Sequence, residues 1–393
     1  MMADARVPTG LPSRGARHPA PIRIAFGIDS LLLGGTETNL WRVATRLDPD
    51  RFSLVVAYSR EGPLLERLVA AGIRTQKIAL PRFRSVRAIW AARDLRRWIR
   101  AERLDVLHTH DVHWNLFGAL ALSRHDETRL MVSRRWGVGQ YPRLLSMANR
   151  MAYARAARVL ANAPSVAESL HREEGVPRAR IEVVPNFADT ALFSASDRDR
   201  DALRAQLGAP ANVLLVGTVA NLYPVKDQGT LLRAVAALPP FSMPVHVAIV
   251  GAGPSRDELR DLAAMLGIAD RVHLPGALPD GGRFHRAFDV STLTSLSEGF
   301  PNTLVEAMAA RRPVVATDVG GVTDAVVDEV TGFVVPPRDY RAVANRLARL
   351  LGDAELRQRL GQAGFDRATA QFHESVVIPR LEAVYQRMGA TGR

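Results

Sequence analysis

The sequence has 393 residues, of which 47% are hydrophobic and 23% charged, an ordinary globular composition that excludes a disordered or collagen-like protein. It contains no cysteine, which excludes disulfides, thiolate nucleophiles and cysteine-ligated metal sites. The formal net charge of +12 is carried almost entirely by Arg, because the chain has only two lysines, Lys77 and Lys226. This charge favours anionic partners, which include phosphates, nucleic acid and an anionic membrane surface.

The first 21 residues mix Arg, Pro, Gly and Ala without the apolar run of a secretory signal, so we interpret residues 1–21 as a disordered leader. No later stretch of about 18 residues is uninterruptedly apolar, so no membrane-spanning helix is expected. We therefore expect a cytoplasmic protein, either free or peripheral on the inner face of the membrane.

From residue 22 onward, short β-rich runs alternate with helical stretches, which predicts βαβ units and a mostly parallel sheet covered on both faces. The expected strands of a first series are 22–28, 53–58, 75–80, 105–109, 129–132, 158–161 and 181–184. A second series follows a polar stretch rich in Asp and Arg, with expected strands 212–219, 244–250, 272–274, 290–294, 313–317 and 332–335. The sequence thus predicts an α/β protein with two doubly wound domains and a boundary near residues 188–210. Ligands of such sheets bind beyond the carboxyl ends of the strands, so the active site is expected in a cleft between the domains.

One helix of the first series is unusually basic. Between Arg82 and Arg103, eight Arg stand against Asp94 and Glu102, and apolar residues occupy one helical face while Arg occupies the other. A helix packed on the sheet with a solvated outer face explains this pattern. Docking to an anionic membrane surface is the alternative.

The segment 297–308 carries the most specific signal. It follows the expected strand 290–294, and Pro301 suits the first turn of a helix. The amides after Pro301 should be unpaired donors at the positive helix end, where an anion binds; they belong to Asn302, Thr303 and Leu304. Glu298 and Glu306 are better placed to accept hydrogen bonds from sugar hydroxyls, and nucleotide sugars offer both chemical groups.

These residues and their surroundings resemble glycosyltransferase family 4, the large group of retaining enzymes with the two-domain B-type fold. The resemblance runs from about residue 22 to residue 388, and its motifs lie at expected strand ends. They are Gly34-Gly35, Val184-Pro185-Asn186, Pro224-Val225-Lys226, Gly251-Ala252-Gly253-Pro254, Arg271-Val272-His273-Leu274-Pro275-Gly276, Glu298-Gly299-Phe300-Pro301 through Glu306, Pro313-Val314-Val315-Ala316-Thr317, Gly320-Gly321 and Thr331-Gly332-Phe333-Val334-Val335-Pro336-Pro337.

The resemblance implies two Rossmann-like domains facing a central cleft: an acceptor-side domain at 22–190, a linker at 191–210, a donor-binding domain at 211–373 and a C-terminal helix at 374–393 that crosses back to the first domain. It implies that Glu306 binds the ribose, Glu298 a hydroxyl of the transferred sugar and Lys226 the diphosphate. It places the backbone of the segment Gly299, Phe300, Pro301, Asn302, Thr303 and Leu304 at the diphosphate. Lysine and helix amides stabilise the leaving group, so no metal and no other cofactor is expected.

On the acceptor side, the resemblance implies that Gly34 and Gly35 approach the donor phosphates and that His110 lines the acceptor site. Arg134 and Arg135 follow the strand 129–132 and suit an acceptor that bears phosphate. Other readings stay open at these positions. The two glycines could merely form a turn, and the two arginines could be solvated. His108, His110 and His113 could suggest a metal site, but a fourth ligand at convincing spacing is missing.

The sequence departs from the family pattern at three places. The stretch 217–223 lacks the second basic residue that often contacts the diphosphate, and Asn221 or Tyr223 can donate a hydrogen bond there without adding charge. Arg311 stands where Gly is common, and Asp324 where Glu is usual.

Transfer of a hexosyl group from a nucleotide diphosphate sugar to an acceptor hydroxyl with retention is therefore expected, in polysaccharide, glycolipid or other envelope glycan synthesis. A lipid-linked or glycan acceptor and an anionic membrane surface are the expected partners besides the donor. The missing basic residue near Asn221 motivates an alternative, a protein that binds a nucleotide sugar with weak or no transfer. Nucleic acid is not expected, because no aromatic-basic platform is present. A dehydrogenase is disfavoured because Gly251-Ala252-Gly253-Pro254 lacks the third glycine and follows the second strand of its domain.

Overall fold

The computed structural model describes residues 20–32, 34–83, 85–123, 125–135, 143–194 and 199–389. Apart from its last two residues, the expected disordered leader 1–21 lies outside the described residues. In the part of the chain that is described, no helix is long and apolar enough to cross a membrane.

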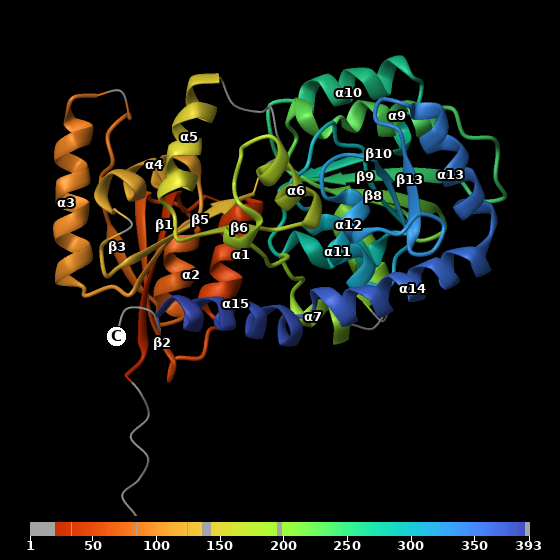
Figure 1. Ribbon diagram of the computed structural model, residues 1–393. Coiled ribbons are helices and arrows are strands. Elements are labelled where there is room, and N and C mark those ends of the chain that lie inside the picture. Colours follow the sequence, from red (N-terminus) through yellow and green to blue (C-terminus); the bar gives the residue numbers. More distant parts are fainter. Residues whose placement is uncertain are drawn as a thin grey trace, which may run out of the picture.

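The first domain is a parallel sheet of seven strands in the order β3-β2-β1-β4-β5-β6-β7, with helices on both faces (Figure 1). Its strands are β1 (Ile22–Ser30), β2 (Phe52–Arg60), β3 (Arg74–Lys77), β4 (Val106–Thr109), β5 (Arg129–Arg134), β6 (Arg158–Ala161) and β7 (Ile181–Val183). Its helices are α1 (Gly35–Ala44), α2 (Leu64–Ala70), α3 (Arg87–Ala101), α4 (Val112–Ala121), α5 (Arg143–Arg155) and α6 (Pro164–Arg172).

The second domain is a parallel sheet of six strands in the order β10-β9-β8-β11-β12-β13. Its strands are β8 (Leu214–Val219), β9 (Val245–Val250), β10 (Val272–Gly276), β11 (Val290–Leu293), β12 (Val314–Thr317) and β13 (Gly332–Val335). Its helices are α8 (Arg200–Leu207), α9 (Gln228–Ala236), α10 (Arg256–Met265), α11 (Asn302–Ala309), α12 (Val322–Ala325), α13 (Tyr340–Gly352) and α14 (Ala354–Phe372), with 3₁₀ turns η3 (Pro224–Lys226) and η5 (Gly281–Ala287). Both sheets are thus doubly wound, as the sequence predicts.

Each sheet has one point where the strand order reverses, between β1 and β4 in the first domain and between β8 and β11 in the second. The loops that leave these strands diverge, which opens a crevice at the carboxyl edge of the sheet. The segments that carry the expected site residues follow these four strands and β5. The topology therefore gathers them at the two edges that face each other.

A glycine in the first strand of each sheet allows close packing there. A side chain at Gly27 in β1 would overlap the ring of Trp114 from α4, and one at Gly217 in β8 would overlap the ring of Phe288. Both aromatic rings are fully buried. Any larger residue would push a helix or turn away from the sheet beside the crevice.

The structure differs from the expected linker 191–210. Helix α7 (Thr190–Ser194) starts it, and α8 covers residues 200–207. Leu203 and Leu207 of α8 are buried in a cluster with Leu215 and Phe288 of the second domain. This part of the chain is polar overall because one helical face is solvated, while its apolar stripe at helical spacing packs on the second sheet.

The C-terminal helix α15 (Glu374–Gly389) leaves the second domain and packs against the first. Figure 1 shows α14 below the second sheet and α15 continuing below the first. Tyr385 of α15 is fully buried in the core of the first domain with Phe26 and Leu40. The first domain is therefore completed by residues more than 180 positions after its last strand.

Candidate active site between the two domains

Lys226 and Glu298 form an ion pair at the edge of the second sheet. Lys226 Nζ donates to Glu298 Oε1 over 2.6 Å, and Ser295 Oγ donates to the same oxygen over 2.6 Å. The Lys226 side chain is 24% exposed and that of Glu298 9%. The partly exposed lysine ammonium thus has one hydrogen-bonding partner among the described residues, and its remaining N–H groups are available to an anion.

The loop after β11 and the start of α11 depart slightly from expectation. Helix α11 begins at Asn302, so Pro301 precedes the helix instead of occupying its first turn. The amides of Asn302 and Leu304 donate to Phe300 O and Pro301 O, over 3.1 and 3.0 Å. Of the three amides expected to be free, only that of Thr303 lacks a partner among the described residues. The reason is a tight 3₁₀-like start of the helix, which satisfies orphan donors internally.

The backbone of this loop is held by its neighbours. Phe300 is buried and contacts the ring of Phe372 at a centroid distance of 5.4 Å, and Leu304 is buried. Gly321 N donates to Gly299 O over 3.0 Å, and a side chain at Gly320 would overlap Glu298 O. Phe300 and Leu304 thus anchor the loop through side chains that are buried in the hydrophobic core.

His285 at the second domain's edge is a residue that sequence reasoning missed. Its Nδ1 lies 2.9 Å from Ser291 Oγ and its Nε2 3.1 Å from Thr303 Oγ1, in the first turn of α11. Burial lowers the pKa of His285 to about 3, so the ring is neutral. A histidine in a Gly-rich stretch gave no motif signal, and only the three-dimensional contact with Thr303 relates it to the site.

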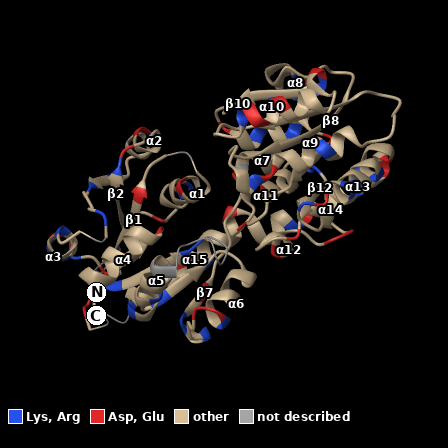
Figure 2. Ribbon diagram, turned by 90° about the horizontal axis from the view of Figure 1, so that it is seen from above, with Lys and Arg blue, Asp and Glu red and all other residues tan. Residues whose placement is uncertain are grey.

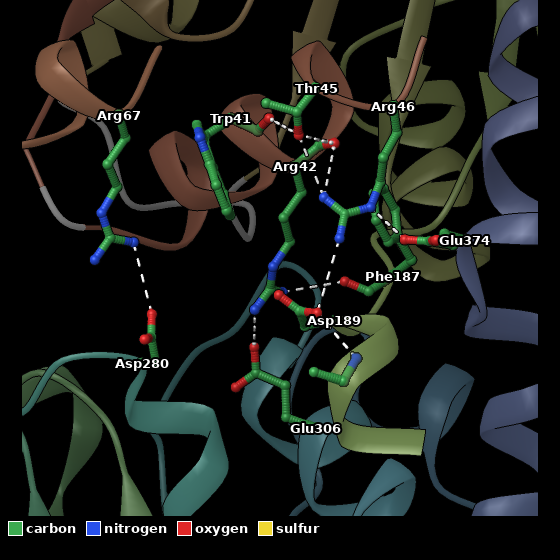
Figure 3. A network of polar contacts seen from close by, with 11 residues as sticks. Trp41, Arg42, Thr45, Arg46, Arg67, Phe187, Asp189, Asp280, Glu306 and Glu374 are labelled. Carbon is green, nitrogen blue, oxygen red and sulfur yellow. Dashed lines mark hydrogen bonds and ion pairs between the residues drawn. The ribbon is translucent and has the colours of Figure 1, made fainter. Parts of the chain in front are cut away.

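Glu306 of α11 reaches across to the first domain. Its Oε1 accepts from Arg42 NH2 of α1 over 2.7 Å, and Arg42 NH1 donates to Phe187 O over 3.1 Å (Figure 3). The two side chains are 9% and 12% exposed. Beside them, Arg67 lies 3.7 Å from Asp280 in a more exposed pair. Arg42 was not anticipated from the sequence, because its position in α1 repeats no motif.

His110 lies at the end of β4 on the opposite edge and is buried. Arg135 NH2 donates to His110 Nδ1 over 3.1 Å, and His110 Nε2 is buried without a partner among the described residues. Burial, with the charges of His108 and Arg135, lowers the pKa of His110 well below its ordinary value. A neutral ring that accepts at Nδ1 carries its proton at Nε2, so His110 presents a hydrogen-bond donor that lacks an acceptor.

Both ring nitrogens of His108 have hydrogen-bonding partners. Its Nδ1 lies 2.7 Å from Tyr385 Oη of α15, and its Nε2 lies 2.7 Å from Ser133 Oγ of β5. His113 instead packs on Phe117 at a centroid distance of 5.1 Å. Within the described ranges, no three His, Asp or Glu side chains come together as metal ligands.

Arg134 and Arg135 were expected on the same side of the cleft, but the structure separates them. Arg134 forms a buried ion pair with Glu174 over 3.1 Å, away from His110. Arg135 donates to Asn186 Oδ1 over 3.1 Å, and burial lowers its pKa to about 10. Successive residues of an extended chain point to opposite faces of the sheet, which is why the two guanidinium groups diverge.

Asn186 connects Arg135 to the other domain. Asn186 Nδ2 donates to Asn302 Oδ1 over 2.8 Å, and Asn302 Nδ2 donates to Gly35 O over 3.4 Å. The start of α11 therefore lies against the start of α1. This contact brings the expected phosphate-binding segments of the two domains together.

The carboxylate of Glu37 lies beside the glycine pair at the start of α1. A side chain at Gly34 would overlap Glu37 Oε2, and Gly35 lies close to Asn302. Burial raises the pKa of Glu37, with the nearby Asp111 adding to it, while Arg135 opposes the shift. Glu37 was not among the expected site residues, and its carboxylate lies against Gly34, one of the two glycines expected near the donor phosphates.

The three departures from the family pattern have distinct surroundings. Asn221 is exposed beyond β8 and brings no charge to the cleft. Arg311 has φ 56°, a conformation that favours glycine, and its guanidinium lies 3.6 Å from the ring centroid of Phe365. Asp324 accepts from Ser165 N of α6 over 3.0 Å, so its carboxylate joins the two domains.

Two family models match the chain, one in each domain. The one described as Glycosyltransferase Family 4 matches residues 33–192, and the one described as Glycosyl transferases group 1 matches residues 199–367. The two matches are collinear with the two sheets. They contain Glu298, Lys226, His110 and the glycines of α1.

Curated relatives carry the name D-inositol 3-phosphate glycosyltransferase. The protein of Stackebrandtia nassauensis is 32% identical over 305 residues, which are 73% of this chain and 64% of the relative. That of Mycolicibacterium vanbaalenii is 35% identical over 313 residues, 75% of this chain and 65% of the relative. That of Nocardia farcinica is 38% identical over 218 residues, 53% of this chain and 48% of the relative. The chain thus spans about half to two thirds of the length of these relatives.

Solved structures share the whole fold. A crystal structure of Anabaena HepE in complex with UDP covers 93% of this chain and 100% of its own, with a TM-score of 0.83 and 23% identity. Sucrose-phosphate synthase of Thermosynechococcus elongatus covers 94% of this chain and 100% of its own, with a TM-score of 0.79 and 21% identity. At these identities the likeness establishes the two-domain B-type architecture.

Proposed function

This chain belongs to the family 4 type of glycosyltransferase, matched by family models in both of its domains, and we propose that it transfers a hexosyl group from a nucleotide diphosphate sugar to an acceptor hydroxyl with retention. The observation that carries the proposal is the Lys226–Glu298 pair at the mouth of the second domain, next to Glu306 on the adjoining helix. It combines a cation for the diphosphate with carboxylates for sugar hydroxyls.

On the donor side, the developing charge of the departing diphosphate needs stabilisation. Lys226 and the Thr303 amide supply it, and His285 fixes the Thr303 hydroxyl in the same turn. Glu306 keeps one carboxylate oxygen beyond the one bound to Arg42, and that oxygen accepts from the ribose. No metal is invoked for this step, since Lys226 and the Thr303 amide provide the electrostatic stabilisation.

On the acceptor side, His110 donates its Nε2–H to an acceptor hydroxyl and does not act as a base, because its pKa lies well below the ordinary value. In a front-face reaction the departing phosphate oxygen removes the acceptor proton. Arg135 adds a positive charge beside His110, which suits an acceptor that carries phosphate. The name of the curated relatives, which refers to an inositol phosphate, supports an acceptor of this class.

A second function on the same scaffold is nucleotide-sugar binding with little transfer. It is favoured by the absence of a basic residue near Asn221 and by Glu37, whose carboxylate lies against one of the two glycines expected near the donor phosphates. Arg42 and Arg135 reach the cleft from the first domain and compensate for the missing charge in our proposal. Both proteins would bind the nucleotide sugar, so a measurement of turnover is needed to distinguish the two functions.

The test starts with thermal unfolding of the full chain in UDP, GDP and ADP sugars. The matching donor at a hundred times its dissociation constant should stabilise the fold by about 2.7 kcal/mol. The donor found is then incubated with phosphorylated polyols, and release of the nucleoside diphosphate and the anomeric configuration of the product are measured. Release that depends on the acceptor, with retention, supports the transferase. Stabilisation without acceptor-dependent release supports the binding protein, and no stabilisation by any donor contradicts both.

We also propose that α3 rests on an anionic membrane surface. Val86, Ile89 and Trp90 are exposed at its N-terminal end, next to the basic face that includes Arg93 and Arg97. Figure 2 shows α3 at the periphery of the first domain, with its basic residues in blue. Apolar side chains beside a basic face are typical of helices that bind the membrane interface. Binding to the membrane surface would bring the protein to a lipid-linked or envelope glycan acceptor.

A further inference from the structure

A cavity of about 320 Å³ lies at the amino-terminal edge of the first sheet, away from the cleft. It is formed where β5 and β6 begin, by the end of α5, and by the last turn of α15. Five arginines line it, and none of its described lining residues is acidic. They are Arg129, Arg155, Arg158, Arg180 and Arg387.

The cavity is separate from the proposed active site. Arg129 is the first residue of β5 and Arg134 the last, in a strand of 6 residues. At about 3.3 Å per residue, the amino and carboxyl edges of the sheet are roughly 20 Å apart. A ligand in the cavity therefore does not touch His110 or Arg135.

The positive charge of the cavity is compensated only in part. Glu182 accepts from Arg158 Nε over 3.2 Å and from Arg387 NH2 over 2.9 Å. Arg180 NH1 donates to the carbonyl of Ala154 at the end of α5 over 3.2 Å. Glu182 thus pairs with two of the five arginines, and guanidinium groups that lie close together repel one another unless an anion lies between them.

The remaining guanidinium N–H groups suit phosphate. Arg155 is exposed and has no ion-pair partner in the described part of the chain. Guanidinium groups bind phosphate oxygens through two parallel hydrogen bonds, and partly buried charges are screened less by salt than surface charges. Arginines from α5, β6 and α15 surround the space from different sides, so a ligand with several phosphate oxygens can contact more than one of them.

We propose that this cavity binds a small molecule that carries two or more phosphate groups. The proposal goes beyond sugar transfer, because the cavity shares no residue with the cleft. Free phosphorylated metabolites and phospholipid headgroups present the same chemistry. Inorganic tripolyphosphate is the probe that tests it without assuming either source.

The experiment is titration calorimetry of the full chain with tripolyphosphate, in the native protein and in R155Q/R387Q. These two side chains are exposed, and Glu182 keeps Arg158 when Arg387 is replaced. Affinity should fall at least tenfold in R155Q/R387Q. A matched control, R260Q/R359Q, removes two exposed charges from the second domain and should change the affinity less than twofold. Lys226→Ala removes the cation placed at the diphosphate of the cleft, so it should abolish any binding there and leave the binding that depends on Arg155 and Arg387 unchanged, which separates the cavity from the cleft.

Equal affinity in the native chain and R155Q/R387Q, loss of binding in Lys226→Ala, or no binding to the native chain would overturn the proposal. The source of the phosphate is then decided with vesicles of neutral and of anionic phospholipid. If R155Q/R387Q sediments less with anionic vesicles than R260Q/R359Q does, the ligand is a lipid headgroup. If both sediment equally while tripolyphosphate binding is lost in R155Q/R387Q alone, the ligand is a free metabolite.

Discussion

The two edges of the cleft are built in different ways. At the second domain's edge, Lys226, Glu298, Thr303 and Glu306 come from η3 and one continuous segment around the start of α11; Lys226 is partly exposed, and both carboxylates are largely buried. At the first domain's edge, buried groups come from β4, β5, the segment after β7 and α15. The pKa values of His108 and His110 are both strongly lowered there. In our proposal the local edge, where Lys226 is partly exposed, binds the charged donor, and the assembled edge, where the neutral His110 lies beside the cationic Arg135, orients the acceptor.

Removal of α15 should have the largest effect and should fall on the first edge alone. Truncation after Phe372 exposes buried partners of β1 and β4 and removes Tyr385 from His108. Each large apolar side chain contributes about 1.5–3 kcal/mol, so the loss approaches the whole stability of a domain, about 5–15 kcal/mol. Calorimetry should show the first domain's transition lost or shifted far down, while the second domain still binds the nucleoside diphosphate. An unchanged transition would mean that α15 is not part of the first domain's core.

At the second edge, Lys226→Ala and Glu306→Ala should each weaken donor binding strongly without unfolding the chain. Hydrogen bonds to charged groups contribute about 1.5–3 kcal/mol, which is roughly a ten- to hundredfold change in affinity. Lys77→Ala is the matched control, because the chain's other lysine is exposed and, in the described part of the first domain, forms an ion pair with Glu61 alone. Donor dissociation constants and kcat/KM report the effect, and unchanged values in both cleft variants would refute the donor site.

The free energy of unfolding should fall at acid pH, because acid protonates histidines in the unfolded chain that stay neutral at both edges of the folded cleft. The buried rings of His108, His110 and His285 stay neutral because burial lowers their pKa values, to about 3 for His285. A histidine whose pKa is lowered in the fold favours the folded state when the pH is above about 6.5, its pKa in the unfolded chain. As the pH falls below that value, the free energy of unfolding decreases by about 1.4 kcal/mol per pH unit for each such histidine. Urea unfolding of His285→Gln between pH 7 and pH 4 should show a shallower decline than the native chain. An identical decline would mean that His285 is charged in the fold.

Arg42 joins the two edges, and its removal should open the cleft. Arg42→Ala leaves the buried carboxylate of Glu306 without its cation, a cost that is relieved when the domains separate and water reaches it. We expect a larger radius of gyration in small-angle scattering and a donor affinity lower by about tenfold. Arg67→Ala, which removes the longer and more exposed pair with Asp280, should change neither. Equal behaviour of the two variants would show that the Arg42–Glu306 pair does not control the cleft.

The smallest effect is expected outside both edges, on α3. Arg93, Arg97 and Arg100 changed to Gln should weaken co-sedimentation with anionic vesicles at low salt, since each near-surface Arg contributes about 1 kcal/mol. Arg96 is kept, because it binds Asp126 and the Ala121 carbonyl. The control changes three exposed arginines of the second domain, Arg341, Arg349 and Arg359, to Gln. Equal sedimentation of the two variants would show that the α3 face is simply solvated.

The sequence by itself determined the architecture and the local edge. Alternating strand and helix patterns define both parallel sheets because the apolar runs of buried strands and the periodic faces of helices are local signals. Lys226, Glu298 and Glu306 could be predicted as site residues because they lie in short motifs at strand ends. The helical spacing of Leu203 and Leu207 was present in the sequence too, although the surrounding charges suggested a linker.

Only the tertiary structure decided what each side chain contacts across the chain. Arg42 meets Glu306 over a separation of 264 residues, and His108 meets Tyr385 over 277, distances at which no sequence period carries information. Strand alternation directs Arg134 to Glu174 and Arg135 to Asn186 and His110. Of the three amides expected to be free at the start of α11, a tight first turn leaves only that of Thr303 without a partner among the described residues. Such pairings depend on how the two sheets pack against each other, because charge and hydrogen-bond partners are chosen by proximity in space.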